Sequence, residues 1–162
     1  MKLSAVLAID GVLRRTVTGA PIEEGIKLMN GLKTFYNIVL VADTAEPMKD
    51  WLDLECVFGY TQVKYPEECL DLSPRLMRLM QVSQIQQQGY AIRMVVEPDP
   101  GVAAHLLVNG YNVLNFLHSQ YALPEWSPDW DGAVRPWEEL SATVARNARL
   151  RAEDKRAKEE AA

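Results

Sequence analysis

The chain has 162 residues, of which 48% are hydrophobic, and its formal net charge at pH 7 is −5. This size and composition suit one globular domain, since domains most often hold about 100–150 residues. This negative net charge argues against a nucleic-acid partner, because nucleic-acid-binding domains usually carry an excess of basic residues. The 2 cysteines and 2 histidines lack the close spacing of a zinc site.

The start of the chain has to be weighed as a signal peptide, because a lysine precedes an apolar run. Asp10 interrupts that run after about seven residues, which favours a buried strand instead. No stretch approaches the roughly 20 apolar residues of a membrane-spanning helix. With so few thiols, we expect a cytoplasmic protein that has no membrane contact.

The first predicted element is a strand at residues 3–9, a continuous apolar run typical of a strand covered on both faces. A helix is predicted at 22–35, with Pro21 at its start, where the missing N–H of proline costs nothing. The apolar side of this helix is expected to consist of Ile22, Ile26, Met29, Leu32 and Phe35.

The pattern of alternating strands and helices continues along the chain. Strands are expected at 38–42, 61–64, 91–96 and 111–117, and helices at 46–54, 73–88 and 100–109. Such alternation predicts an α/β domain over residues 1–118, with a three-layer, Rossmann-like parallel sheet.

The sequence changes character after residue 118. Residues 119–136 are rich in proline and tryptophan, which predicts an irregular segment packing on the domain. Its tryptophans either cover the core or form a surface for a partner or for self-association. Residues 137–162 predict a charged helical tail whose apolar side consists of Trp137, Leu140 and Val144. This tail is either a solvated helix, stabilised by charge pairs four residues apart, or a helix that docks on another chain.

Polar residues follow three of the predicted strands. They are Asp10, the pair Asp43 and Thr44, and the pair Glu97 and Asp99. Because parallel sheets place their sites at the carboxyl ends of the strands, we expect the candidate site at this edge.

The segment "AIDGVL" at residues 8–13 resembles the first motif of the haloacid dehalogenase-like (HAD) superfamily. In that family an apolar strand runs into two aspartates one residue apart, the first a nucleophile and the second a general acid and base. The resemblance implies that Asp10 is the general acid and base and that the nucleophile position is Ala8. A methyl group can neither form an aspartyl-phosphate nor bind Mg²⁺.

The second and third motifs of the family are also altered. Its phosphate-binding hydroxyl falls at Ala42, with Thr44 as a substitute if the loop bends inward. Its basic residue falls at Ser73, and Arg75 or Arg78 would have to compensate. The resemblance thus implies phosphate binding by Thr44 and Arg75.

The fourth motif, an acidic pair after a strand, is matched by Glu97 and Asp99. The resemblance implies a Mg²⁺ site formed by this pair and Asp10, with weak or absent metal binding because position 8 lacks a carboxylate. The alternative for Asp99 is the N-cap of the following helix. The alternative for Asp10 is a carboxylate that stabilises its own turn, and Asp43 is a further candidate as replacement nucleophile.

The layout over residues 3–117 is similar to the HAD-like fold without a large cap domain, because the spacers after Leu13 and Asp43 are short. The whole chain also resembles small HAD-like proteins of actinobacterial phages. We therefore expect a catalytically degenerate HAD-like protein with a binding or assembly role, in a host cytoplasm or a phage particle. The alternative is a Mg²⁺-dependent phosphohydrolase of small phosphate esters or nucleotides that uses Asp10 as general acid and base.

Overall fold

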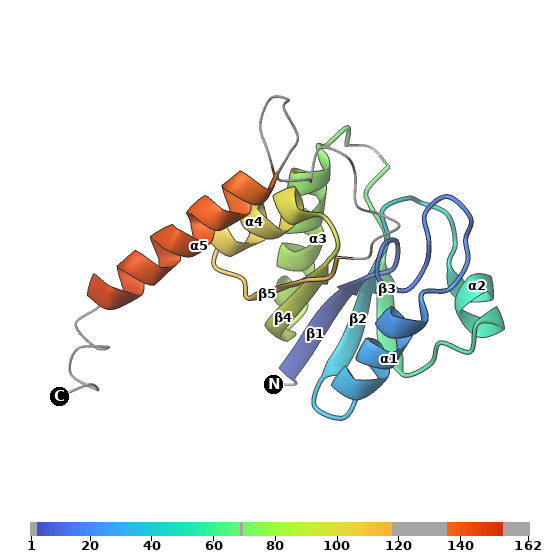
Figure 1. Ribbon diagram of the computed structural model, residues 1–162. Coiled ribbons are helices and arrows are strands. Elements are labelled where there is room, and N and C mark those ends of the chain that lie inside the picture. Colours follow the sequence, from blue (N-terminus) through green and yellow to red (C-terminus); the bar gives the residue numbers. More distant parts are fainter. Residues whose placement is uncertain (1–2, 69, 118–135, 154–162) are drawn as a thin grey trace.

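The structure is a computed structural model that describes residues 3–68, 70–117 and 136–153 (Figure 1). Within the last range it describes the side chains of residues 140–150. The segment expected at 119–136 lies outside the described residues, apart from Pro136, as does the end of the expected tail helix. The side chains of all three tryptophans of these two segments, Trp126, Trp130 and Trp137, also lie outside.

Strands and helices alternate along the chain as predicted. The strands are β1 (Leu3–Ala8), β2 (Asn37–Val41), β3 (Tyr60–Lys64), β4 (Ala91–Glu97) and β5 (Val113–Asn115). The helices are α1 (Glu23–Leu32), α2 (Lys49–Leu54), α3 (Pro74–Gln87), α4 (Pro100–Val108) and α5 (Pro136–Glu153).

The five strands form one parallel sheet in the order β3-β2-β1-β4-β5. Figure 1 shows α1 and α2 on one face of the sheet and α3 and α4 on the other. The chain is thus a three-layer, Rossmann-like α/β domain, which confirms the predicted fold class. Among the described residues, no helix is long and apolar enough to cross a membrane.

The central strand β1 accounts for much of the core. Its residues Ser4–Ala8 are buried, because β2 and β4 pair with both of its edges and helices cover both faces. A strand covered in this way has no polar face, so its sequence is a continuous apolar run. The same run continues through Ile9, which is fully buried.

The predicted helix at 22–35 ends earlier than expected. α1 stops at Leu32, and Phe35, expected on its apolar side, is 77% exposed. The Thr34 hydroxyl donates a hydrogen bond to the Gly31 carbonyl at 2.7 Å, and the chain then turns into β2 at Asn37. The expected strand at 111–117 is likewise shorter, because β5 pairs only with the end of β4.

α5 lies beside α4 on the outer side of the domain (Figure 1). Thr143 is buried, whereas Val144, expected on the apolar side of the tail helix, is 55% exposed. Of these two neighbouring residues, Thr143 is therefore the one that the fold covers.

Candidate functional site

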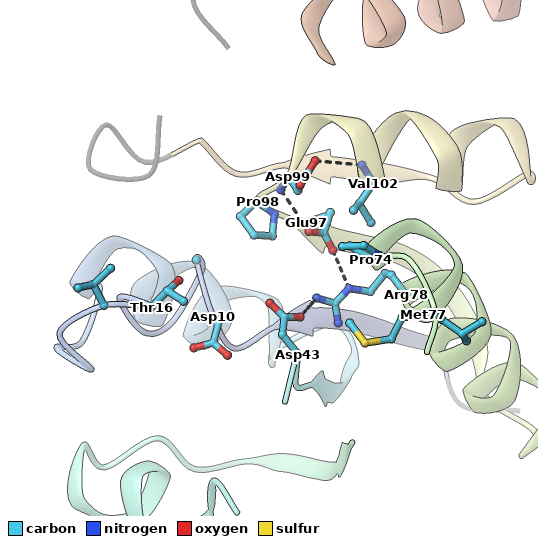
Figure 2. A pocket seen from close by; sticks show the side chains of 13 residues that line it. Asp10, Thr16, Asp43, Pro74, Met77, Arg78, Glu97, Pro98, Asp99 and Val102 are labelled. Carbon is cyan, nitrogen blue, oxygen red and sulfur yellow. Dashed lines mark hydrogen bonds and ion pairs between the residues drawn. The ribbon is translucent and has the colours of Figure 1, made fainter. Parts of the chain in front are cut away.

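The candidate site lies where the connections of the sheet change direction. β1 lies between β2 and β4 in the sheet. The chain leaves β1 toward one side of the sheet and leaves β4 toward the other, so the loops after these two strands diverge and leave a crevice. A cavity of about 620 Å³ opens there (Figure 2). Its polar lining consists of Asp10, Thr16, Asp43, Arg78, Glu97 and Asp99, and its apolar lining includes Val17, Leu72, Pro74, Met77, Pro98 and Val102.

Arg78 is the centre of the polar lining. It lies on the buried side of α3 and is 3% exposed. Its Nε donates to Oε2 of Glu97 at 2.8 Å, and its Nη2 donates to Oδ1 of Asp43. Figure 2 shows the guanidinium between these two carboxylates. Arg78 thereby joins the ends of β2 and β4, the two strands that flank β1 and its last residue, Ala8.

Gln81, one turn further along α3, extends this network. Its side-chain oxygen accepts a hydrogen bond from Nη1 of Arg78 at 2.9 Å. Its Nε2 donates to the carbonyl of Ala42 at 2.8 Å and to that of Lys64 at 3.3 Å. The buried amide thus binds the ends of β2 and β3, and all three guanidinium nitrogens of Arg78 donate to neighbouring side chains.

Burial and pairing act in opposite directions on these groups. Burial alone would lower the pKa of Arg78, but the attraction of Glu97 and Asp43 outweighs it, and the pKa is raised. Burial raises the pKa of Glu97 above its ordinary value of 4.5, and the pairing with Arg78 offsets only part of this. The cost of removing a carboxylate from water is therefore not fully recovered by its partner.

Asp10 is paired within its own loop. It is 5% exposed and accepts a hydrogen bond from Nε of Arg14 at 2.9 Å. The Arg14 guanidinium also lies over the ring of Trp51, 5.9 Å from its centroid, and the indole N–H of Trp51 donates to the Gly19 carbonyl. These contacts hold the connection between β1 and α1 in place, as expected for a carboxylate that stabilises its turn.

Gly11 brings the loops after β1 and β4 into direct contact. Its φ is +88°, a left-handed conformation that favours glycine, and a Cβ there would lie 2.6 Å from Cγ of Pro98. Gly11 and Pro98 both line the cavity at this contact.

The two helices that begin at the cavity are capped by their own residues. Asp99 is the N-cap of α4, and its Oδ1 accepts hydrogen bonds from the backbone N–H of Gly101 at 2.7 Å and of Val102 at 3.1 Å. Ser73 is the N-cap of α3 and accepts from the N–H of Leu76 at 3.4 Å. At both helix N-termini, a capping side chain therefore accepts hydrogen bonds from backbone N–H groups to which an anion could otherwise bind.

The residues predicted from the family motifs are only partly brought together. Asp10, Glu97 and Asp99 line the same cavity. Thr44 is exposed and is not among the lining residues. Arg75 also lies outside the lining, and its guanidinium is beside Gly101 at the start of α4. Ala8 and Ala42 are buried in the core.

Sequence reasoning named Arg78 only as a substitute phosphate ligand and missed its pairing with Glu97 and Asp43. The position of Arg78 in the sequence does indicate that its side chain is buried. Arg78 precedes Val82 and Ile85 by four and seven residues, the spacing of one helix face, and all three are buried. A cation on an apolar helix face needs a buried carboxylate partner.

The carboxylates of the cavity do not fit a Mg²⁺ site of the expected kind. Glu97 binds Arg78 through Oε2 and accepts the Asp99 N–H through Oε1 at 3.2 Å, and Asp99 caps α4. In the part of the chain that the structure describes, no three His, Cys, Asp or Glu residues are grouped to hold a metal ion. A divalent ion would have to compete with the guanidinium of Arg78, a side chain of the same protein, for the oxygens of Glu97 and Asp43.

The fold and the site together define an α/β domain with a cavity at the direction change of its sheet and a buried arginine between two carboxylates. No protein-family model matches the sequence, and no curated protein matches it.

Proposed function

We propose that the chain is a catalytically inactive HAD-like domain with a binding or assembly role. The observation that carries this proposal is the pairing of Arg78 with both Glu97 and Asp43. In a phosphotransfer site of this family, a nucleophilic carboxylate and a divalent ion act at the end of the first strand. Here that strand ends on Ala8, and the acidic groups of its neighbours neutralise an internal cation.

The binding role is supported by the cavity itself. Ligand sites are typically concave and mostly apolar, with few polar groups. The cavity of about 620 Å³ meets this description, since apolar side chains from the first loop, α3 and α4 surround its polar residues. An assembly role through residues 119–136 or the tail helix, in a host cytoplasm or a phage particle, belongs to the same proposal. The exposed Val144 and Leu150 of α5 offer apolar surface for it.

The alternative is the Mg²⁺-dependent phosphohydrolase. The observation in its favour is that Asp10, Glu97 and Asp99 line one cavity. Against it, Asp10 is paired with Arg14 and both other carboxylates bind protein groups. We therefore rank it second.

Phosphatase assays separate the two functions. Native protein, Ala8→Asp and Asp10→Asn are incubated with Mg²⁺ and a panel of phosphate esters and nucleotides. We expect no turnover by any of the three. The native protein and Asp10→Asn lack a carboxylate at position 8, and Ala8→Asp restores that carboxylate but leaves Arg78 paired with Glu97 and Asp43. Hydrolysis by the native protein that is lost in Asp10→Asn would establish the alternative.

A metal titration gives a readout that does not depend on activity. A folded-state ligand raises thermal stability by mass action. We expect the melting temperature of the native protein to be the same in millimolar Mg²⁺ and in excess chelator at equal ionic strength. A Mg²⁺-specific rise that Glu97→Gln abolishes would contradict the inactive assignment.

A further inference from the structure

We infer that the cavity binds an alkylammonium group, an apolar chain with a cationic end, and discriminates against phosphate esters. This inference rests on the proposed binding function and names the chemistry of its ligand. It follows from three properties of the lining: the guanidinium nitrogens and the N-terminal N–H groups of α4 donate to the chain's own side chains, the accessible charge is negative, and the walls are apolar.

The groups that would best hold a phosphate already bind the chain's own side chains. Each nitrogen of the Arg78 guanidinium donates to Glu97, Gln81 or Asp43. At the start of α4, the N–H groups of Gly101 and Val102 donate to Asp99. Anions bind helix N-termini through such free N–H groups, and here a carboxylate of the chain occupies that position. An incoming phosphate would have to displace it.

The charge of the lining favours a cation. Four carboxylates and the guanidinium of Arg78 line the cavity, and Arg14 pairs with one of the carboxylates, Asp10, from outside the lining. The side chain of Asp43 is 39% exposed, whereas that of Arg78 is 3% exposed. The accessible end of this ion pair is thus the carboxylate, and the cation lies beneath it. A cleft lined mainly by one sign of charge concentrates ligands of the opposite sign.

The form of the cation follows from the walls. Leu72, Met77 and Val102 contribute apolar surface from the chain leading into α3, from α3 itself and from α4. An alkyl chain placed along these side chains leaves water, which is favourable in proportion to its apolar area. An ammonium group at its end supplies three donors and no acceptor, which suits the exposed carboxylate of Asp43.

The test is a series of probes that share one alkyl chain: hexylammonium, hexanol and hexyl phosphate. Each is titrated into the full chain in metal-free buffer and followed by the backbone amide NMR signals of Gly11, Asp43, Met77 and Val102. We expect hexylammonium to bind about 1.5- to fivefold more tightly than hexanol, the range of a partly exposed ion pair. We expect hexyl phosphate to bind more weakly than hexanol. Tighter binding of hexyl phosphate, equal binding of all three, or no response at these amides would overturn the inference.

The role of Asp43 is tested by Asp43→Asn. We expect this variant to lose the preference for hexylammonium over hexanol while still binding hexanol. Asp53→Asn serves as the matched control, because Asp53 is exposed on α2 and does not line the cavity. It should retain the native preference. An unchanged preference in Asp43→Asn would contradict the assignment, and the native series remains decisive if that variant does not fold.

A fourth probe distinguishes a free amine from a lysine side chain of a partner protein. Nα-acetyl-lysine methylamide carries the same ammonium group on a peptide-like unit. If it binds more tightly than hexylammonium, the ligand is a lysine side chain, and the reverse order assigns a free amine. The head-group series needs neither Mg²⁺ nor turnover, so its failure leaves the phosphatase result untouched. Turnover of phosphate esters by the native chain, in contrast, would contradict both the inactive assignment and the discrimination against phosphate.

Discussion

Arg78 and Glu97 form a buried ion pair in which Nε and Oε2 are 2.8 Å apart and the side chains are 3% and 2% exposed. The two residues are 19 positions apart in the sequence and belong to α3 and the end of β4. Asp43, after β2, completes the arrangement on the same guanidinium. A positive charge is therefore built into the place where three parallel strands end.

Arg78→Met should be strongly destabilising, because it leaves Glu97 buried without its partner. Removing one member of a buried ion pair typically costs about 3–5 kcal/mol. Urea unfolding followed by circular dichroism gives the free energy of unfolding. The double variant Arg78→Met/Glu97→Gln should recover part of the loss, since it no longer buries an uncompensated carboxylate.

The matched control for Arg78→Met is Lys27→Met. Lys27 pairs with Glu23 on the surface, with both side chains about three-quarters exposed. Its loss should change the free energy of unfolding by less than about 0.5 kcal/mol. Equal effects at the two positions would show that the Arg78 network is not a buried ion pair.

Glu97 should give stability an unusual pH dependence. Burial raises its pKa above the ordinary value of 4.5, so the folded chain binds this proton more tightly than the unfolded chain does. The contribution of Glu97 is thus fully present below pH 4.5 and is lost as the pH rises through the raised pKa. Other carboxylates also titrate, so the quantity to compare is the free energy of unfolding of the native protein minus that of Glu97→Gln.

We expect this difference to fall between pH 4 and neutrality when urea unfolding is measured across that range. Glu46→Gln is the control, because the Glu46 side chain is 62% exposed. Its difference from the native protein should vary little over the same range. A difference that rises with pH for Glu97→Gln would mean that the pKa of Glu97 is lowered by Arg78 and not raised by burial.

Gly11→Ala should destabilise the domain and disturb the cavity. The left-handed conformation costs a non-glycine residue about 1–2 kcal/mol, and the contact with Pro98 adds an overpacking cost of about 1–3 kcal/mol. Thermal and urea unfolding measure the sum. Gly31→Ala is the matched substitution, since Gly31 lies in α1 with open space around its Cα. It should stabilise the protein by roughly 0.5–1 kcal/mol, and destabilisation of both variants alike would contradict the assigned role of Gly11.

Asp99 can be tested as a helix cap by comparing two substitutions. Asp99→Ala removes the acceptor for the N–H groups of Gly101 and Val102 and should cost about 0.5–2 kcal/mol. Asp99→Asn keeps an acceptor of nearly equal capping strength, so its free energy of unfolding should stay close to that of the native protein. A loss as large in Asp99→Asn as in Asp99→Ala would indicate that the negative charge, and not the cap, is what the site needs.

The fold was predictable because its signals are local. The apolar run of β1, the proline and serine at the start of α3, and Gly89 after that helix each act through neighbouring residues. Asp99 was also open to prediction, because an N-cap lies next to the helix that it serves. Phe35 was predicted wrongly because helical spacing alone cannot locate the end of α1.

The polar centre of the site was harder to predict. Arg78 meets Asp43 and Glu97 only after α3 has packed across the ends of two strands, and these partners are 35 and 19 residues away. Sequence spacing within one helix shows that Arg78 faces the core, but it does not show which carboxylate it meets. That choice is made by the order of the strands in the sheet.

The cation that neutralises these strand ends is tethered to α3 by a side chain, so it can neither dissociate nor be removed by a chelator. Its local concentration is fixed by the fold and not by the composition of the surrounding solution. The cavity should accordingly keep its shape and charge whether divalent ions are scarce or abundant, which a site held together by a bound metal does not do.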